Sequence, residues 1–406
     1  MFNKLNSELK RNLLVLFTAG LLFWSSIASL LPGTPLYVEY IGGTKQEIGI
    51  VMGSFAIGLL LFRPSLGKMA DNRGRKIVLL IGVIVVAIAP LGYILVSSIP
   101  LLMALRAFHG ISLAAFTTAY AAFVTDIAPP ENRGEILGYM SLVNPIGMAI
   151  GPAMGGYLQS YFGYTALFLN SSAIGFIALI CALQLKNPKL TDQQRQESQD
   201  NSFWRMLFSP RVKVPAIVML LIGLAFGALS TFVPLYIKSS NIDLNPGLFY
   251  TAAAISSFCI RIVTGRISDR LGRGLFVTFG IACYSMSMVL LYFADSPSAF
   301  LIAGLVEGMG GGTMIPMIMT MMADRSQPYE RGRIFALCVT GFDVGIAVAG
   351  PVFGSVGDKL GYRVMFAYAA GLTFLAILIF LTQSAQGLIN SIKFALGRGE
   401  DSYALK

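Results

Sequence analysis

Four ionisable side chains lie well inside long apolar stretches of this sequence. Arg106 and His109 share one stretch, three residues apart, while Glu307 and Asp343 lie in two others. A charged group is costly to place in membrane hydrocarbon, so such residues usually serve a function. Burial favours the protonated form of a carboxyl group, and histidine changes its charge near neutral pH. These residue types therefore predict a site that takes up and releases protons.

The elements that carry these side chains are predicted to span a membrane. Of the 406 residues, 55% are hydrophobic and only 12% are charged, whereas soluble domains carry about 25% charged residues. Apolar runs of about twenty residues can cross roughly 30 Å of hydrocarbon, and helices satisfy their own backbone there. We expect an all-α membrane protein with twelve transmembrane helices, near 12–38, 44–66, 75–96, 99–125, 134–157, 164–185, 212–238, 244–267, 274–294, 297–323, 332–355 and 362–383.

The distribution of basic residues predicts the topology. The net charge is +10, and if the N-terminus is cytoplasmic, 25 of the 30 Lys and Arg residues fall on that side. Basic residues gather on the cytoplasmic side of membrane proteins, so we expect a multi-pass protein of the cell (inner) membrane with both termini in the cytoplasm. The positive charge then reflects topology, and no nucleic-acid partner is expected. Because the first apolar run continues to about residue 38, we expect no cleaved signal peptide.

A repeated charged sequence divides the chain into two halves. GKMADNRGRK (67–76) returns as GRISDRLGRG (265–274), and the same offset of 198 residues places His109 opposite Glu307. Such a repeat predicts two similar structural units. We expect a six-helix bundle over 1–185, a cytoplasmic linker over 186–211, a second six-helix bundle over 212–385 and a cytoplasmic tail over 386–406.

The tail holds a short periodic pattern of its own. Leu388, Ile392 and Leu396 recur every four residues, with Lys393 and Arg398 nearby. This spacing fits an amphipathic helix at the membrane interface, and a frayed end is the alternative.

The chain resembles the major facilitator superfamily of secondary transporters from about residue 13 to 381. GKMADNRGRK and GRISDRLGRG are similar to that family's loop motifs after its second and eighth helices, although Asn72 stands where a basic residue is usual. LMALRAFHG (102–110) resembles its helix-4 motif, in which Gln is usual in place of His109. The resemblance implies two pseudo-symmetric six-helix bundles.

A glycine pattern narrows the resemblance to the twelve-helix drug/proton antiporter family, whose helix-5 motif it matches at every fixed position. The resemblance associates this motif with proton-coupled drug exporters. Glycines at close to helical spacing form a face without side chains, and a proline permits a bend. A seal that favours exchange over leak and a plain packing groove both fit this face. The matching residues are Gly138, Gly147, Gly151, Pro152, Gly155 and Gly156.

The resemblance implies that the charged loops act as conformational latches at the cytoplasmic ends of the two halves. Glycines allow a tight turn there, and Arg75 is implied to pair with Asp126 at the end of helix 4. Charges that only fix the topology are the alternative, although the loop aspartates contribute nothing to that rule. The expected latch residues are Gly67, Asp71, Arg73, Gly74, Arg75, Asp126, Asp269 and Arg273.

The family's central cavity is lined by helices 1, 4, 7 and 10, so the resemblance implies that Arg106, His109 and Glu307 share it. We expect Glu307 and His109 to carry protons and Arg106 to bias their titration; a structural ion pair between helices 4 and 10 is the alternative. Asp343 fits a second proton site or a hydrogen-bonded packing residue. The expected lining of the substrate cavity suits an amphipathic ligand, and it comprises Trp24, Ser25, Ser29, Tyr120, Phe226, Thr231 and Met314.

These features predict a secondary active transporter that works by alternating access. The leading hypothesis is proton-coupled efflux of a small amphipathic compound or drug, although helix 1 lacks the mid-membrane acid that several multidrug exporters carry. A proton-coupled importer or facilitator of a small metabolite such as a sugar, and a lipid transporter, are the alternatives. Without a nucleotide loop or a paired Cys/His pattern, we expect no enzyme, no cofactor and no metal site. The expected partners are a small-molecule substrate, protons and the lipid bilayer, and a monomer suffices for the pathway.

Overall fold

The computed structural model describes residues 7–129, 132–185, 209–327 and 331–405, apart from the side chains of 265–266, 269–270 and 331–333. Residues 186–208 of the expected linker therefore lie outside the described residues. The chain forms two compact units built of helices. Unit 1 comprises Met1–Gly43, Ser54–Ser198 and Asn245–Gly247, and unit 2 comprises Thr44–Gly53, Gln199–Leu244 and Leu248–Lys406.

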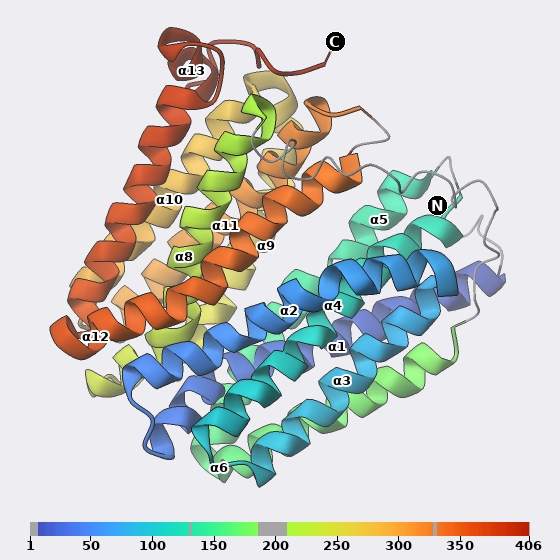
Figure 1. Cartoon of the computed structure of the whole chain (residues 1–406), viewed down its shortest axis with the longest axis vertical. Helices are drawn as coiled ribbons and strands as arrows, with labels where there is room; N and C mark the ends of the chain where they lie inside the picture. The colour runs from blue at the N-terminus through green and yellow to red at the C-terminus, as the bar shows by residue number, and fades with distance from the viewer. Residues whose placement is uncertain (1–6, 130–131, 186–208, 328–330, 406) are drawn as a thin grey trace. The chain divides into compact units, whose positions relative to one another are not determined.

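Unit 1 contains the helices of the first half of the chain (Figure 1). α4 begins with a proline in its first turn, where the missing amide proton breaks no helical hydrogen bond. The first turns of α2 belong to unit 2. The helices are α1 (Ser7–Tyr40), α2 (Lys45–Arg73), α3 (Arg75–Leu95), α4 (Ile99–Ile127), α5 (Arg133–Ser141) and α6 (Val143–Leu183).

Unit 2 repeats this plan and adds a short helix at its C-terminal end. α8 and α11 also begin with a proline in the first turn. Figure 1 shows the added helix, α13, next to the end of α12. The helices are α8 (Pro210–Ser239), α9 (Gly247–Leu271), α10 (Arg273–Phe293), α11 (Pro297–Asp324), α12 (Arg331–Gln383) and α13 (Leu388–Ala395).

The predicted spans correspond to the observed helices. Within the described residues, ten helical stretches are long and apolar enough to cross a membrane. Two of them are interrupted by a glycine in the left-handed region, Gly163 in α6 (φ 81°) and Gly361 in α12 (φ 80°). Glycine adopts this conformation at no steric cost, because it lacks a Cβ atom. Each break falls between two predicted spans, so counting both sides of the breaks gives the twelve that were expected.

Aromatic stacking contributes to the packing of the helices in unit 1. In unit 1, Phe23 of α1 stacks on Phe116 of α4 with ring centroids 3.8 Å apart.

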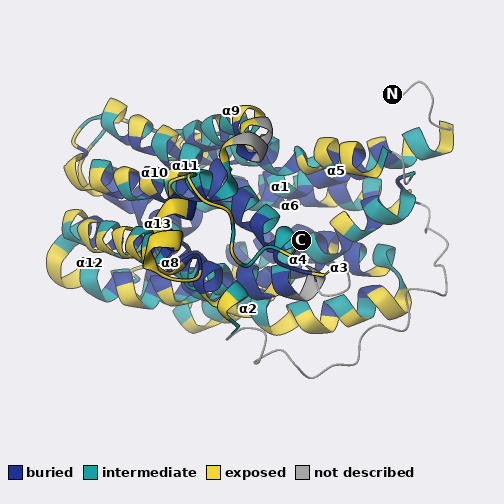
Figure 2. Cartoon of the chain, turned by 90° about the horizontal axis from the view of Figure 1, so that it is seen from above, coloured by how far each residue is buried: buried dark blue, intermediate teal, exposed yellow. Residues whose placement is uncertain are grey.

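Figure 2 shows that exposed positions recur along the outer sides of the helices, whereas buried positions face neighbouring helices. Several of the exposed side chains are large and apolar, such as Leu61 (69% exposed) and Leu95 (85% exposed). A membrane protein presents such side chains to lipid.

A buried arginine holds the C-terminal segment against unit 2. Arg325, directly after α11, is 0% exposed. Its Nε donates to Asp401 Oδ2 at 2.7 Å, and its Nη2 donates to the carbonyl oxygen of Ser384 at 2.8 Å. Buried charges are stable only when they are paired and hydrogen-bonded, so this ion pair ties the last described residues to the unit. The tail is therefore packed rather than frayed, and its periodic pattern forms α13.

Candidate functional site

The first charged loop joins α2 to α3 in unit 1. Arg73 ends α2, Gly74 has a φ of 100°, and Arg75 begins α3. A side chain at the turn would strain the backbone, so glycine is required there. Arg75 Nε lies 3.4 Å from Asp126 Oδ2, and Arg75 Nη1 donates to Asp71. The implied pair between the loop and the end of α4 is thus present.

The second charged loop repeats this arrangement in unit 2. Gly272 has a φ of 87° between α9 and α10. Arg273 Nε then lies 2.6 Å from Asp324 Oδ2 at the end of α11. The side chain of Asp269 is not among those described. Gly67, which was expected to help form the first turn, lies inside α2, where an added Cβ would meet nothing within 4 Å, so the turn depends on Gly74 alone. Each loop is therefore held by an arginine to the fourth helix of its own unit.

Three glycines of the helix-5 motif bring α6 into backbone contact with α1. An added Cβ at Gly151 would lie 2.6 Å from the carbonyl oxygen of Ser25, and at Gly155 only 1.9 Å from that of Ser29. Gly147 approaches the same helix closely. No Cβ atom fits at these distances, so any larger residue must push the two helices apart. We call this contact the α1–α6 seam.

The other positions of the motif differ from one another. An added Cβ at Gly156 would lie 2.0 Å from Asn245 Oδ1, which belongs to the same unit. At Gly138, in α5, it would meet nothing within 4 Å. Pro152 lies inside α6, whose only interior residue with non-helical angles is Gly163. The proline therefore does not break the helix.

His109 is buried in unit 1, where it lies close to a tyrosine hydroxyl and to Arg106. Its side chain is 0% exposed, and its Nδ1 lies 2.9 Å from the hydroxyl oxygen of Tyr93 in α3. The imidazole meets the ring of Phe55 in α2 edge-on, with centroids 5.5 Å apart. The guanidinium carbon of Arg106 lies 4.8 Å from the centroid of the same ring. This polar cluster therefore lies between α2, α3 and α4.

Glu307 occupies the corresponding helix of unit 2. It is 7% exposed, and the hydroxyl of Tyr284 in α10 donates to its Oε1 at 2.5 Å. Glycines surround it: an added Cβ at Gly311 would lie 3.6 Å from Oε1, and one at Gly308 would lie 1.9 Å from the carbonyl oxygen of Ala253 in α9. α11 can therefore approach α9 and α10 closely around the carboxyl group. Asp343 is also buried in this unit, 6% exposed, in α12.

The two tyrosines are functional candidates that sequence reasoning missed. Tyr93 precedes His109 by 16 residues, whereas Tyr284 precedes Glu307 by 23. The repeat offset therefore does not relate them. The available signal was a tyrosine inside an apolar span, because a buried hydroxyl needs a hydrogen-bond partner.

The residues expected to line the substrate cavity are largely buried in their own units. In unit 1 the hydroxyl of Tyr120 donates to the carbonyl oxygen of Met140 at 3.1 Å. In unit 2 Met314 packs against Gly280 of α10. Exposed fractions are 6% for Ser25, 0% for Ser29, 8% for Tyr120, 3% for Thr231 and 0% for Met314, while Trp24 and Phe226 are partly buried. Their contact with a substrate stays a prediction.

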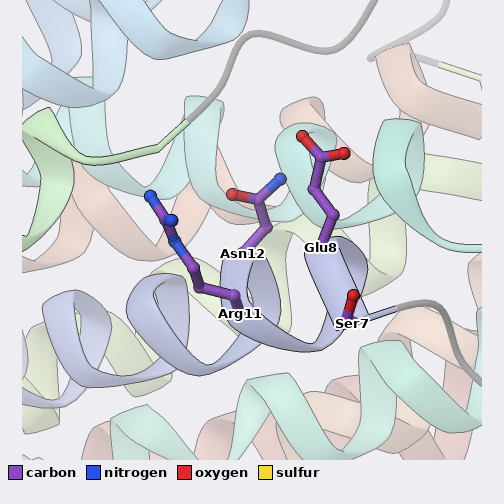
Figure 3. Close-up of a pocket in the computed structure, with 4 residues that line it drawn as sticks. All are labelled: Ser7, Glu8, Arg11 and Asn12. Atoms are coloured by element: carbon purple, nitrogen blue, oxygen red, sulfur yellow. The ribbon is translucent and has the colours of Figure 1, made fainter.

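A hollow of 330 Å³ lies at the N-terminal end of α1 (Figure 3). It is lined by Ser7, Glu8, Arg11 and Asn12, all from the first turns of that helix. In Figure 3 Glu8, Arg11 and Asn12 point to the same side of the helix. Among the described residues the lining comes from α1 alone, and none of these side chains is buried, so we assign this hollow no ligand.

Comparison with known proteins gives a family and relatives over most of the chain. The sequence profile of the Major Facilitator Superfamily matches residues 15–294 and 247–388. Multidrug resistance protein MdtG of Klebsiella pneumoniae is 26% identical over 375 residues, 89% of this chain and 90% of that protein. The protein of the same name from Salmonella typhi is 25% identical, over 89% of this chain and 92% of that protein.

Solved structures share the fold. The nucleoside transporter NupG superposes with a TM-score of 0.78 at 15% identity, covering 91% of this chain and 99% of that chain. A bacterial homologue of the human lysosomal transporter Spinster gives a TM-score of 0.71 at 13% identity, covering 97% of each chain. At these identities the likeness concerns the fold alone, and it confirms the expected major facilitator fold.

Proposed function

Because this chain belongs to the major facilitator superfamily, we propose that it exports a small amphipathic compound in exchange for protons. The chain is a multi-pass membrane transporter and not an enzyme. Relatives at 25–26% identity bear the name multidrug resistance protein, which favours a drug-like substrate. The direction of transport, the coupling to protons and the cytoplasmic position of both termini belong to the proposal.

The buried carboxyl group of Glu307 carries the proposal. It lies in a spanning helix, 7% exposed, and ionisable groups at such positions commonly mark proton or substrate pathways. Tyr284 donates a 2.5 Å hydrogen bond to Oε1, which favours the ionised form, while burial favours the neutral form. Two opposing effects of this kind suit a group that must gain and lose a proton in each cycle.

In the proposed cycle Glu307 releases its proton as the substrate binds and takes up another after the substrate has left. We assign it as the principal carrier, because it is an acid whose partner, Tyr284, is neutral. His109 and Arg106 form a second polar cluster, which contributes either a further proton site or a link between helices. Asp343 is proposed as a second proton site.

The α1–α6 seam supports exchange over leak. Gly151 and Gly155 bring the backbone of α6 against that of α1, so these two positions leave no room for a file of water molecules. The pairs of Arg75 with Asp126 and of Arg273 with Asp324 hold the charged loops to the ends of α4 and α11. We propose that these loops act as latches during alternating access.

Proton release in liposomes tests this function. Purified protein would be reconstituted, a pH gradient imposed and a panel of amphipathic compounds added. Wild type would be compared with Glu307→Gln and with Glu135→Gln, a matched change of an exposed glutamate at the start of α5. We expect compound-dependent proton release from wild type and Glu135→Gln but not from Glu307→Gln. Unchanged release from Glu307→Gln would refute its assignment as the carrier, and compound movement without proton flux in every protein would indicate a facilitator.

A further inference from the structure

The short helix α13 has one buried face and one exposed apolar face. One face is packed into unit 2 through Ser391, Phe394 and Ala395, which are 0–4% exposed. The other face carries large apolar side chains that remain open. Their exposed fractions are 55% for Leu388, 69% for Ile389 and 39% for Ile392, and Leu396, the residue directly after the helix, is 45% exposed.

Contacts on the packed face fix the orientation of the open one. The hydroxyl of Thr278 in α10 donates to the carbonyl oxygen of Ala395 at 2.9 Å. An added Cβ at Gly274 would lie 2.2 Å from the carbonyl oxygen of Phe394, so α13 lies directly on the start of α10. The buried pair of Arg325 with Asp401 holds the chain after the helix. The open face therefore cannot turn inwards to cover its apolar side chains.

The place of α13 in the chain puts it at a membrane surface. The second part of α12 runs from the break at Gly361 to Gln383, and at 1.5 Å per residue it is about 33 Å long. That length matches roughly 30 Å of hydrocarbon. α13 begins five residues after Gln383, and so it lies at the level of the lipid headgroups.

Basic side chains border the open face. Lys393 and Arg398 are both exposed, and no acidic residue lies between Leu388 and Arg398. A helix with an apolar face and basic flanks binds in the plane of a membrane interface, most strongly where the lipids are anionic. Each basic residue close to an anionic surface contributes about a factor of five in affinity.

We propose that α13 lies in the headgroup layer and binds anionic phospholipid. The upper acyl chains then surround the exposed apolar side chains of Leu388, Ile389, Ile392 and Leu396. The lipid phosphates contact Lys393 and Arg398. α13 packs on Gly274 and Thr278, which directly follow the second charged loop. Lipid bound to α13 therefore restricts the movement of that loop. The inference concerns lipid alone and does not depend on proton coupling.

A tryptophan reporter tests this proposal in the full-length protein. The chain has two tryptophans, and both would be replaced in a Trp24→Phe, Trp204→Phe background. Ile389→Trp then places an indole on the open face, and Asn390→Trp places a matched one on the next residue, roughly 100° around the helix. Each protein would be reconstituted in phosphatidylcholine with phosphatidylglycerol, one of the two lipids carrying bromine on its acyl chains.

We expect blue-shifted emission from the Ile389→Trp protein, with stronger quenching by brominated phosphatidylglycerol than by brominated phosphatidylcholine. The enrichment of the anionic lipid should reach up to roughly 25-fold, and Lys393→Gln with Arg398→Gln should abolish it. Arg11→Gln with Arg133→Gln, which removes two exposed charges from unit 1, should leave it unchanged. Water-like emission without quenching would overturn the membrane contact, and equal quenching by both lipids would overturn the anionic partner.

Discussion

Replacing Gly155 by alanine is expected to force α1 and α6 apart. The added Cβ would lie 1.9 Å from the carbonyl oxygen of Ser29, 2.7 Å from its carbonyl carbon and 2.9 Å from its Cα. All three are backbone atoms, which cannot rotate away as the end of a side chain can. Ordinary contact begins at 3.4 Å, so relief of the closest approach needs a shift of about 1.5 Å, the difference of 3.4 and 1.9. Overpacking of this kind costs about 1–3 kcal/mol, and the helix propensity of alanine offsets up to about 1 kcal/mol.

Gly138→Ala is the matched control within the same motif. An added Cβ there would meet nothing within 4 Å, and the residue lies inside α5. Alanine should therefore stabilise the protein by about 0.5–1 kcal/mol, because it favours the helix and restricts the unfolded chain. The two substitutions are chemically identical but are expected to change stability in opposite directions.

Thermal unfolding of the purified variants in detergent would measure these effects, with the folded fraction followed by size-exclusion chromatography. Proton leak into liposomes without any compound would be measured in parallel. We expect Gly155→Ala to melt below wild type and to leak more, and Gly138→Ala to melt at or above wild type without added leak. If both variants melted alike, or if Gly155→Ala were the more stable, the backbone contact between α1 and α6 would be contradicted.

Three further outcomes are expected. Tyr284→Phe should lower compound-dependent proton release by roughly tenfold and shift its pH profile, because a hydrogen bond to a charged group such as Glu307 contributes about 1.5 kcal/mol. Stopped-flow measurement of proton flux would test this, and an unchanged pH profile would contradict it. Asp401→Asn should destabilise the protein by about 3 kcal/mol, because it leaves the buried Arg325 without its carboxylate. Limited proteolysis of the tail should then be faster, and an unaltered rate would count against the packed tail. His109→Gln should keep most of the compound-dependent release; a loss as complete as that of Glu307→Gln would overturn the ranking of the two carriers.

The spans could be predicted from the sequence because crossing a bilayer requires a length of apolar residues that soluble proteins rarely have. The breaks were predictable to within a few residues, since Gly163 and Gly361 lie in the short gaps between neighbouring apolar runs. The pair of Arg75 with Asp126 was predictable only through the resemblance, because the two residues are 51 positions apart.

Long-range partners without a repeated spacing could not be predicted. The repeat offset of 198 residues places Leu291, not Tyr284, opposite Tyr93, although each tyrosine meets the buried ionisable residue of the next helix. In the sequence Arg325 looks like any basic residue at a helix end. Nothing near it marks its carboxylate partner, which lies 76 residues later. Such contacts depend on how each helix is rotated about its axis relative to its neighbours. The length of an apolar run does not determine this rotation.

The central claim is that a proton gradient drives export, and concentrative transport in liposomes tests it most directly. Liposomes with an acidic lumen would hold wild-type protein, and a fluorescent amphiphile that triggers proton release in the compound panel, and that carries no titratable group itself, would be added outside. We expect the compound to accumulate in the lumen above its outside concentration, and a protonophore or Glu307→Gln to abolish the accumulation. Protein-free liposomes give the passive baseline. Equilibration to equal concentrations, unaffected by the pH gradient, would contradict proton-driven export.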